Sequence, residues 1–196
     1  MNELKSIVVF CGSNSGNVTL YAEQAYSLGK ELAKQEIRLV YGAAKIGIMG
    51  QVANGSLDNK GNVVGVIPEF LKLREVYHDG LSQLMITKNM HERKLKMYDL
   101  SDGIIMLPGG FGTLEEFFEM LTWAQLGLHA KPIGILNVNG FYDSLMQMLK
   151  HMVQSGFVKK ENYDMIVVNS SIRELLNEMK HYKPTQVKKW IQKEHL

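Results

Sequence analysis

Residues 103–124 read GIIMLPGGFGTLEEFFEMLTWA, and this stretch decides how the rest of the chain is interpreted. Its apolar run at 103–107 predicts a buried β-strand. Apolar side chains then recur at the spacing of one helix face, at Leu114, Phe117, Phe118, Leu121 and Ala124. The stretch is therefore predicted to form a strand, a tight turn and an α-helix.

The turn between these elements contains Gly109, Gly110 and Gly112 within four positions. Glycine leaves the backbone bare, so unpaired N–H groups and the positive end of the helix dipole face whatever binds there. The turn, up to Thr113, therefore predicts an anion site, and phosphate is the usual ligand of such a site.

Strands and helices alternate along the rest of the chain. Further strands are predicted at residues 6–11, 37–41, 62–67, 81–86, 132–136 and 165–168. Helices are predicted around residues 21–32, 52–57, 89–100, 145–152 and 172–179, and residues 69–80 are less regular. This alternation predicts βαβ units and a doubly wound parallel sheet with helices on both faces. A ligand site is then expected beyond the carboxyl ends of the strands.

The chain of 196 residues fits one domain, predicted to span residues 1–180. Residues 181–196 are predicted to form a basic C-terminal helix or tail, with lysines facing solvent. With 22 basic and 20 acidic residues the net charge is +2, which argues against a nucleic-acid partner. The single Cys11 excludes an internal disulfide, and no apolar run reaches membrane length. We expect a cytoplasmic protein.

Several common nucleotide-binding motifs are missing from the glycine-rich turns. None has the G-x-x-x-x-G-K-[ST] spacing of a P-loop, and the first turn, with Gly12 and Gly16, lacks G-x-G-x-x-G. The second predicted strand ends in Tyr41, where a dinucleotide-binding domain places an acid. These features argue against P-loop hydrolysis and NAD chemistry. Tight packing of strand on helix is an alternative reason for the glycines of the first two turns.

The charged residues Glu116, Arg93 and Lys94 each have both a structural and a chemical interpretation. Thr113 and Glu116 fit a capping box, in which Thr113 is the N-cap and Glu116 the third helical residue. Alternatively, Glu116 points toward a sugar, and Arg93 and Lys94 enter the same cleft and neutralise the acidic cluster. Both cations could instead be solvated surface residues. Cys11, at the end of a buried strand, is interpreted as a core residue rather than a nucleophile.

Two motifs resemble one known family. Residues 108–116, PGGFGTLEE, resemble the P-G-G-x-G-T-x-x-E signature of the LONELY GUY (LOG) family, and residues 90–94, MHERK, resemble its companion motif. Gly12 and Ser13, after Cys11, fit the first turn of that family. The resemblance implies a Rossmann-like fold, a homodimer, and no metal or organic cofactor. It also implies that an older lysine-decarboxylase label of many members does not describe their reaction.

The resemblance further implies an activity and a set of site residues. The activity is hydrolysis of the N-glycosidic bond of cytokinin riboside 5′-monophosphates to free base and ribose 5-phosphate. Arg93 and Glu116 are the implied catalytic pair. The implied substrate contacts are Gly12, Ser13, Glu75, Lys94, Gly109, Gly110, Phe111, Gly112, Thr113, Leu114, Glu115 and Thr122.

One departure from the family pattern concerns the second glycine-rich turn. Where the family has G-G-G-x-x-G-L-M-G, residues 42–50 read GAAKIGIMG, so that Ala43 and Ala44 replace two glycines. Alanine tolerates positive φ poorly, so either the pocket has changed or the turn needs only its remaining glycines. The main alternative to a hydrolase is a non-catalytic nucleotide-binding or carrier protein that uses the same loops.

Overall fold

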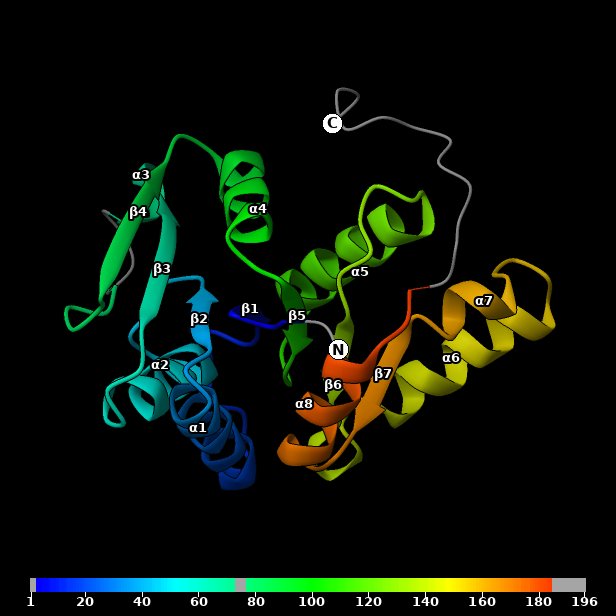
Figure 1. The fold of residues 1–196 in the computed structure, drawn as a ribbon, viewed down its shortest axis with the longest axis horizontal. Helices are drawn as coiled ribbons and strands as arrows, with labels where there is room; N and C mark the ends of the chain where they lie inside the picture. Colours follow the sequence, from blue (N-terminus) through cyan, green and yellow to red (C-terminus); the bar gives the residue numbers. More distant parts are fainter. Residues whose placement is uncertain (1–2, 73–76, 185–196) are drawn as a thin grey trace.

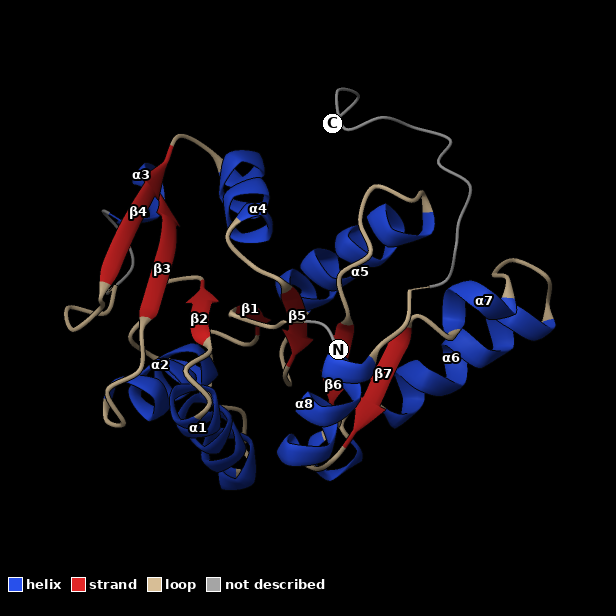
Figure 2. Ribbon diagram, viewed as in Figure 1, coloured by secondary structure: helices blue, strands red, loops and turns tan. Residues whose placement is uncertain are grey.

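A computed structural model of the protein describes residues 3–72 and 77–184. Within these ranges, one parallel sheet forms the centre of the molecule (Figures 1 and 2). Its strands are β1 (Ser6–Phe10), β2 (Arg38–Tyr41), β3 (Val63–Pro68), β4 (Gln83–Thr87), β5 (Gly103–Met106), β6 (Ile133–Leu136) and β7 (Ile166–Asn169). They are ordered β4-β3-β2-β1-β5-β6-β7.

Helices connect successive strands, as a doubly wound fold requires. They are α1 (Thr19–Lys34), α2 (Gly47–Leu57), α3 (Glu69–Lys72), α4 (Met90–Asp99), α5 (Phe111–Gln125), α6 (Asp143–Gln154), α7 (Lys160–Tyr163) and α8 (Ile172–His181). A 3₁₀ turn, η1 (Val138–Gly140), precedes α6. None of the described helices is long and apolar enough to cross a membrane.

The sheet is buried on both faces, and each face has its own core. Along β1, Ile7 and Val9 pack with apolar residues of α1, α2 and α8, whereas Val8 and Phe10 pack with those of α4, α5 and α6. This alternation follows from the two-residue period of a strand. Figure 1 shows α1 and α2 on one side of the sheet and α4 and α5 on the other. The predicted doubly wound single domain is confirmed.

The chain changes direction across the sheet between β1 and β5. Strands β2, β3 and β4 extend the sheet from one side of β1, and β5 returns to pair with its other side, with Phe10 opposite Met106. In doubly wound folds, the loops after the two strands at such a switch point diverge and leave a crevice at the carboxyl edge. The glycine-rich turns after β1 and β5 meet there.

Most predicted elements agree with the structure to within a residue or two. Helix α2 is longer than predicted because it begins at Gly47 rather than residue 52, and Pro68 is the last residue of β3 instead of following it. The short α3, α7 and η1 have no predicted counterpart. On α6 only Leu149 of the predicted apolar face is buried. Of the predicted C-terminal basic segment, residues 185–196 lie outside the described residues.

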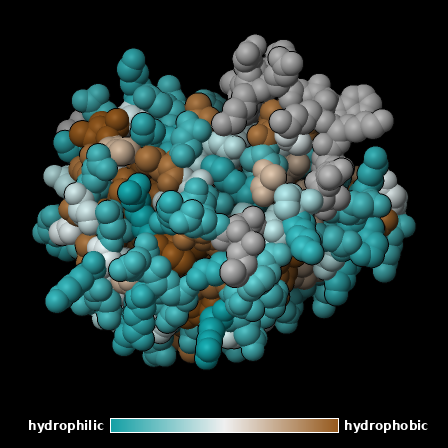
Figure 3. Space-filling model, in the orientation of Figure 1, coloured by the Kyte–Doolittle hydropathy of each residue, from teal (hydrophilic) through white to brown (hydrophobic). Residues whose placement is uncertain are grey.

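Some apolar side chains remain at the surface of the described chain. Figure 3 shows them as brown patches among polar atoms, including a patch at the upper left, where Figure 1 places α3 and β4. Phe70 on α3 and Ile86 on β4 are both about half exposed, at 48% and 49%. Leu95 on α4 is 40% exposed.

Candidate active site

A cavity of about 610 Å³ opens at the switch point, between the turns that follow β1 and β5. Residues 12–14, 16 and 17 form one wall, and residues 108–113 form another. The remaining lining includes Gly42 and the side chains of Tyr21, Met49, Met90, Arg93, Met97, Glu116 and Phe141. The fold therefore brings the two predicted catalytic residues and the predicted anion turn into one cavity.

Helix α5 begins with its first N–H groups unsatisfied by its own backbone. Its N-cap is Gly110, which has no side chain to cap the helix, and its first helical hydrogen bond runs from the Leu114 N–H to the Gly110 carbonyl oxygen. The N–H groups of Phe111, Gly112 and Thr113 thus have no acceptor within the helix. Together with the helix dipole they form a site suited to an anion.

The capping box predicted for this helix is wrong. Thr113 is the third residue of α5 rather than its N-cap, and Glu116 lies one turn further along. Thr113 is buried and its hydroxyl packs against Gly109, where an added Cβ atom would come within 2.1 Å of the Thr113 oxygen. Glu116 is therefore not engaged in capping.

The three positions of the turn require or favour glycine for different physical reasons. A Cβ at Gly109 would collide with Thr113 and with the Gly12 backbone nitrogen, so packing alone requires this glycine. A Cβ at Gly110 or Gly112 would meet no protein atom within 4 Å. These two residues border open space, which lets a ligand approach the backbone closely.

A capping arrangement does occur at α4, the helix that carries Arg93. The Asn89 side chain accepts a hydrogen bond from the Glu92 N–H, and the Glu92 carboxylate accepts one from the Lys88 N–H. These bonds satisfy donors at the start of the helix and fix where it begins. Arg93 follows directly, in the first turn of this capped helix.

Arg93 is buried, at 7% exposure, and backbone carbonyls hold its guanidinium. Its Nε donates to the Val66 carbonyl at 3.1 Å, and its Nη2 donates to the Gly42 carbonyl at 3.1 Å. A Cβ at Gly42 would come within 2.2 Å of Nη2, so only glycine leaves room for the guanidinium here. The interpretation of Arg93 as a solvated surface residue is wrong.

Glu116 is partly buried in the cavity, and no hydrogen bond or ion pair within the described residues engages its carboxyl. Burial raises the pKa of this carboxyl from 4.5 to about 7, although the nearby Arg93 charge lowers it. Glu115 and Glu119 add to the rise and Lys94 opposes it. Near neutral pH, both the acid and the carboxylate forms of Glu116 are therefore accessible.

Lys94 turns away from the cavity. Its buried ammonium bonds to Glu115 and, at 3.0 Å, to Glu119, which ties α4 to α5. Burial alone would lower the pKa of Lys94, but hydrogen bonds to these two carboxylates raise it. The prediction that both cations enter the cleft holds for Arg93 and is wrong for Lys94.

The other predicted site residues divide between the cavity and its surroundings. Gly12, Ser13 and residues 109–113 line the cavity. Lys94, Leu114, Glu115 and Thr122 are outside its lining, and the exposed Thr122 donates its hydroxyl hydrogen bond to the Phe118 carbonyl. Glu75 lies outside the described residues.

Cys11 lines the cavity but does not have the character of a nucleophile. Its side chain is buried, and burial together with Glu116 raises the pKa of the thiol well above its ordinary value. The thiol is therefore protonated at neutral pH, which agrees with its interpretation as a core residue.

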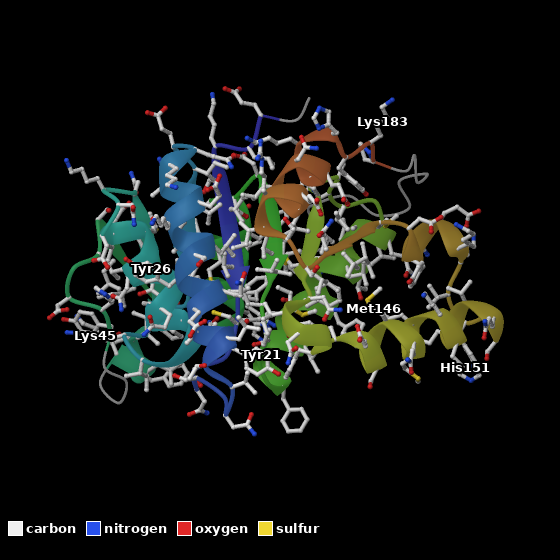
Figure 4. All side chains as sticks on the ribbon, turned by 90° about the horizontal axis from the view of Figure 1, so that it is seen from below. Tyr21, Tyr26, Lys45, Met146, His151 and Lys183 are labelled. Atoms are coloured by element: carbon white, nitrogen blue, oxygen red, sulfur yellow. The ribbon has the colours of Figure 1, made fainter. Side chains whose placement is uncertain are left out.

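Sequence reasoning missed an aromatic wall and several methionines. Tyr21 and Phe141 pack edge to face with ring centroids 5.5 Å apart, and both line the cavity. Figure 4 labels Tyr21, which lies near the start of α1. The positions of these two aromatic residues in the sequence could have indicated that they line the cavity, because both residues follow the carboxyl ends of strands. Met49, Met90 and Met97 complete the apolar lining.

Comparison with known proteins decides the family. A family model described as "Possible lysine decarboxylase" matches residues 49–179. A cytokinin riboside 5′-monophosphate phosphoribohydrolase of Rhodococcoides fascians is 46% identical over 86% of this chain and 85% of its own length. A protein of the same name from Arabidopsis thaliana, LOG1, is 42% identical over 95% of this chain and 88% of its own length. The chain belongs to the LOG family.

Solved structures share the LOG fold at much lower identity. The molybdenum cofactor binding protein of Rippkaea orientalis superposes with a TM-score of 0.70 and 21% identity, over 92% of this chain and 98% of that protein. Identity at this level establishes the common architecture only. The fold alone therefore does not separate an enzyme from a carrier, and the side chains of the site must do so.

The two alanines in the second turn of this LOG protein do not reach the cavity. Gly42 and residues 48 and 49 line the cavity, whereas Ala43 and Ala44 are buried and are not part of its lining. Ala43 does adopt a left-handed backbone, with a φ of 68°, which is costly for alanine. The departure from the family pattern thus lies outside the cavity lining.

Proposed function

We propose that this LOG protein hydrolyses the N-glycosidic bond of adenosine 5′-monophosphates, including N6-substituted ones, to free base and ribose 5-phosphate. The similar proteins named above as cytokinin riboside 5′-monophosphate phosphoribohydrolases support a cytokinin-activating role. One observation carries the proposal for this chain. A carboxyl with a pKa near 7, not engaged in capping, faces a cavity that also contains a buried guanidinium and an open helix N-terminus.

The phosphate is proposed to bind at residues 109–113 and against the turn that contains Gly12 and Ser13. The exposed N–H groups at the start of α5 supply donors, and the bare faces of Gly110 and Gly112 let the anion come close. Because this end of the nucleotide does not react, its binding energy orients the ribose for the chemical step. A nucleoside without the phosphate is then expected to be a poor substrate.

Glu116 and Arg93 are proposed to act at the ribose. When the bond from C1′ to the base breaks, its electron pair leaves with the base and positive charge develops on the sugar ring. The Glu116 carboxylate stabilises this charge or orients the water that attacks C1′. The Arg93 guanidinium, held by the Gly42 and Val66 carbonyls, favours the ionised form of Glu116 and positions the substrate.

Further substrate contacts are proposed from the family resemblance alone. They are Glu75, Phe111, Leu114, Glu115 and Thr122; Lys94 is left out because its ammonium bonds to Glu115 and Glu119 instead of entering the cavity. We also propose that the protein is a cytoplasmic homodimer. Exposed apolar residues on α3, β4 and α4 are compatible with a subunit contact. Light scattering coupled to size-exclusion chromatography tests the dimer, and a monomer at micromolar concentration would contradict it.

The alternative of a non-catalytic carrier on the same fold is not favoured. A carrier needs the anion site but gains nothing from a partly buried carboxyl whose pKa is raised to about 7. Such a group costs free energy when it ionises, and groups of this kind cluster where proton transfer or charge stabilisation occurs.

The decisive experiment measures release of free base from AMP and from N6-prenylated AMP. Glu116→Gln keeps the shape of the side chain and removes its charge, so we expect kcat to fall by about 100-fold or more. Arg93→Ala should also lose activity, whereas Glu161→Gln on the exposed α7 is the matched control and should not. Nucleotide binding by calorimetry with no base released by the wild type would favour the carrier.

A further inference from the structure

The loop after β2 has a strained residue at its centre. Ala43 has a φ of 68° and is fully buried, so its backbone is held in a left-handed conformation that alanine disfavours. A neighbouring segment, residues 77–80, holds it there. The His78 N–H donates to the Ala43 carbonyl at 2.9 Å, and Tyr77 forms an antiparallel bridge with Ala44.

The His78 side chain anchors this neighbouring segment. It is buried, at 8% exposure, and its Nε2 lies 2.9 Å from the side-chain oxygen of Asn54 on α2. Its Nδ1 accepts a hydrogen bond from the Gly80 N–H at 3.0 Å. An acceptor at Nδ1 requires the proton to reside on Nε2, which then donates to Asn54. The neutral imidazole thus joins the segment to α2 by two bonds.

Charged groups around His78 add to the same connection. Lys45, in the strained loop, bonds to Asp79 at 2.9 Å, and Asp79 lies 4.0 Å from the imidazole. Burial lowers the pKa of His78, and Lys45 acts in the same direction, while Asp79 and Asp58 oppose it. The neutral tautomer that the geometry requires is therefore the favoured form at neutral pH.

The strained loop supplies one acceptor of the Arg93 guanidinium and packs beside the residue that supplies the other. Gly42, directly before Ala43, supplies the carbonyl that accepts from Nη2. Ala43 itself packs on Gly65, where an added Cβ atom would come within 2.8 Å of the Ala43 methyl carbon. Gly65 directly precedes Val66, whose carbonyl accepts from Nε. A shift of Ala43 would therefore move one acceptor and loosen the packing beside the other.

We propose that His78 is a positioning residue for the reaction, acting through the strained Ala43 loop to hold Arg93 in the cavity with Glu116. The inference rests on the proposed function for its activity readout. His78 does not line the cavity, so it acts on the substrate only through Arg93. A displaced Arg93 would impair the chemical step while leaving the phosphate contacts at residues 109–113 in place.

The first test is His78→Phe, which keeps a ring of similar size and the backbone N–H but removes both ring hydrogen bonds. We expect kcat to fall by about 10-fold to 100-fold, with a much smaller change in KM, because a misplaced catalytic group costs about this much. Asn54→Ala removes the other partner on α2 and should reproduce part of the loss. The matched control is His151→Phe on the exposed face of α6, far from Lys45 in Figure 4.

Two double variants distinguish positioning from a loss of stability. In the Arg93→Ala background, His78→Phe should cause no further loss of kcat, because the residue through which it acts is gone. Ala43→Gly relieves the backbone strain, so the loop no longer needs residues 77–80 to hold its conformation. His78→Phe should therefore lower kcat less in the Ala43→Gly background than it does in the wild type. Equal losses in every background would overturn the inference.

The pH dependence supplies a readout that does not require activity. Arg93 lowers the pKa of Glu116, so its displacement in His78→Phe should move the Glu116 titration to higher pH. The acid limb of kcat should shift likewise. Carbon-13 NMR of the Glu116 carboxyl measures the titration even if the wild type proves inactive, which separates failure of the proposed function from failure of this inference. An unchanged titration in His78→Phe would refute the positioning role.

Discussion

The two glycine-rich loops that border the cavity look alike in sequence but differ in what surrounds them. In the loop at residues 109–113, Gly110 and Gly112 face open space. In the loop at residues 42–50, Gly42 faces the Arg93 guanidinium, and Gly47, with a φ of 64°, packs directly on the Ser13 carbonyl. One loop is left open for a ligand, and the other is filled by the protein itself.

This difference shows that glycine has two functions at one site. In the open loop the missing side chain exposes backbone N–H groups to an anion. In the closed loop it makes room for a cation that the chain supplies, and the carbonyl of the same glycine binds that cation. The two loops thus suit opposite charges: the open loop is proposed to bind phosphate, and the closed loop holds the guanidinium, with Glu116 in the same cavity.

The largest effect is expected from adding a methyl group to the closed loop. In Gly42→Ala the new Cβ would collide with Arg93 and come within 3.0 Å of the Met49 sulfur, so the guanidinium must leave its two carbonyls. We expect kcat for base release to fall by about 100-fold. Steady-state kinetics measures the loss, and circular dichroism checks the fold. Near-normal kcat would show that the closed loop does not set the Arg93 position.

The same methyl group in the open loop should act differently. Gly112→Ala encounters no protein atom within 4 Å and lies in the first turn of α5, so the variant should be more stable by about 0.5–1 kcal/mol. Its methyl group obstructs the bound phosphate, and KM should rise by about 10-fold with a smaller effect on kcat. Urea denaturation and nucleotide titration test both parts. A loss of stability would contradict the assignment of open space.

A last effect concerns the charge of Glu116, which lines the same cavity as the two loops. Its pKa is raised from 4.5 to about 7, so the folded state favours the protonated form. The resulting stability is fully present below pH 4.5 and is lost as the pH rises through about 7. At pH 8, Glu116→Gln should therefore melt several degrees above wild type, and the difference should shrink toward pH 4.5. Differential scanning calorimetry at both pH values tests this, and equal Tm differences would refute it.

The course of the main chain was largely predictable from the sequence. Continuous apolar runs and helix-spaced apolar residues located the strands and most helices, because both faces of the sheet must be covered. Short elements such as α3 and α7 were not predicted, since four residues do not establish a period. The glycine turns also placed the cavity correctly, because the carboxyl ends of parallel strands share one edge.

The orientation of the charged side chains was not predictable in the same way. Arg93 and Lys94 are adjacent in sequence, yet Arg93 faces the cavity and Lys94 binds Glu115 and Glu119. Neighbouring helical residues point about 100° apart, so the rotation of α4 decides which cation enters. The partners that hold each cation lie far along the chain, at Gly42 for Arg93 and at Glu115 and Glu119 for Lys94. The cap at Asn89 and Glu92 fixes where α4 begins, whereas the sequence pattern suggested a capping box on α5.

The sequence by itself determined the alternating fold, the edge of the sheet where the cavity lies, and the family to which the motifs belong. These features depend on local periodicity and short motifs, and each such pattern is contained in a short stretch of the sequence. The tertiary structure decided what each glycine faces, which cation enters the cavity, and that Glu116 is left without a capping partner. These depend on contacts between residues far apart in the chain, such as Gly42 with Arg93 and His78 with Asn54, and local patterns do not encode them.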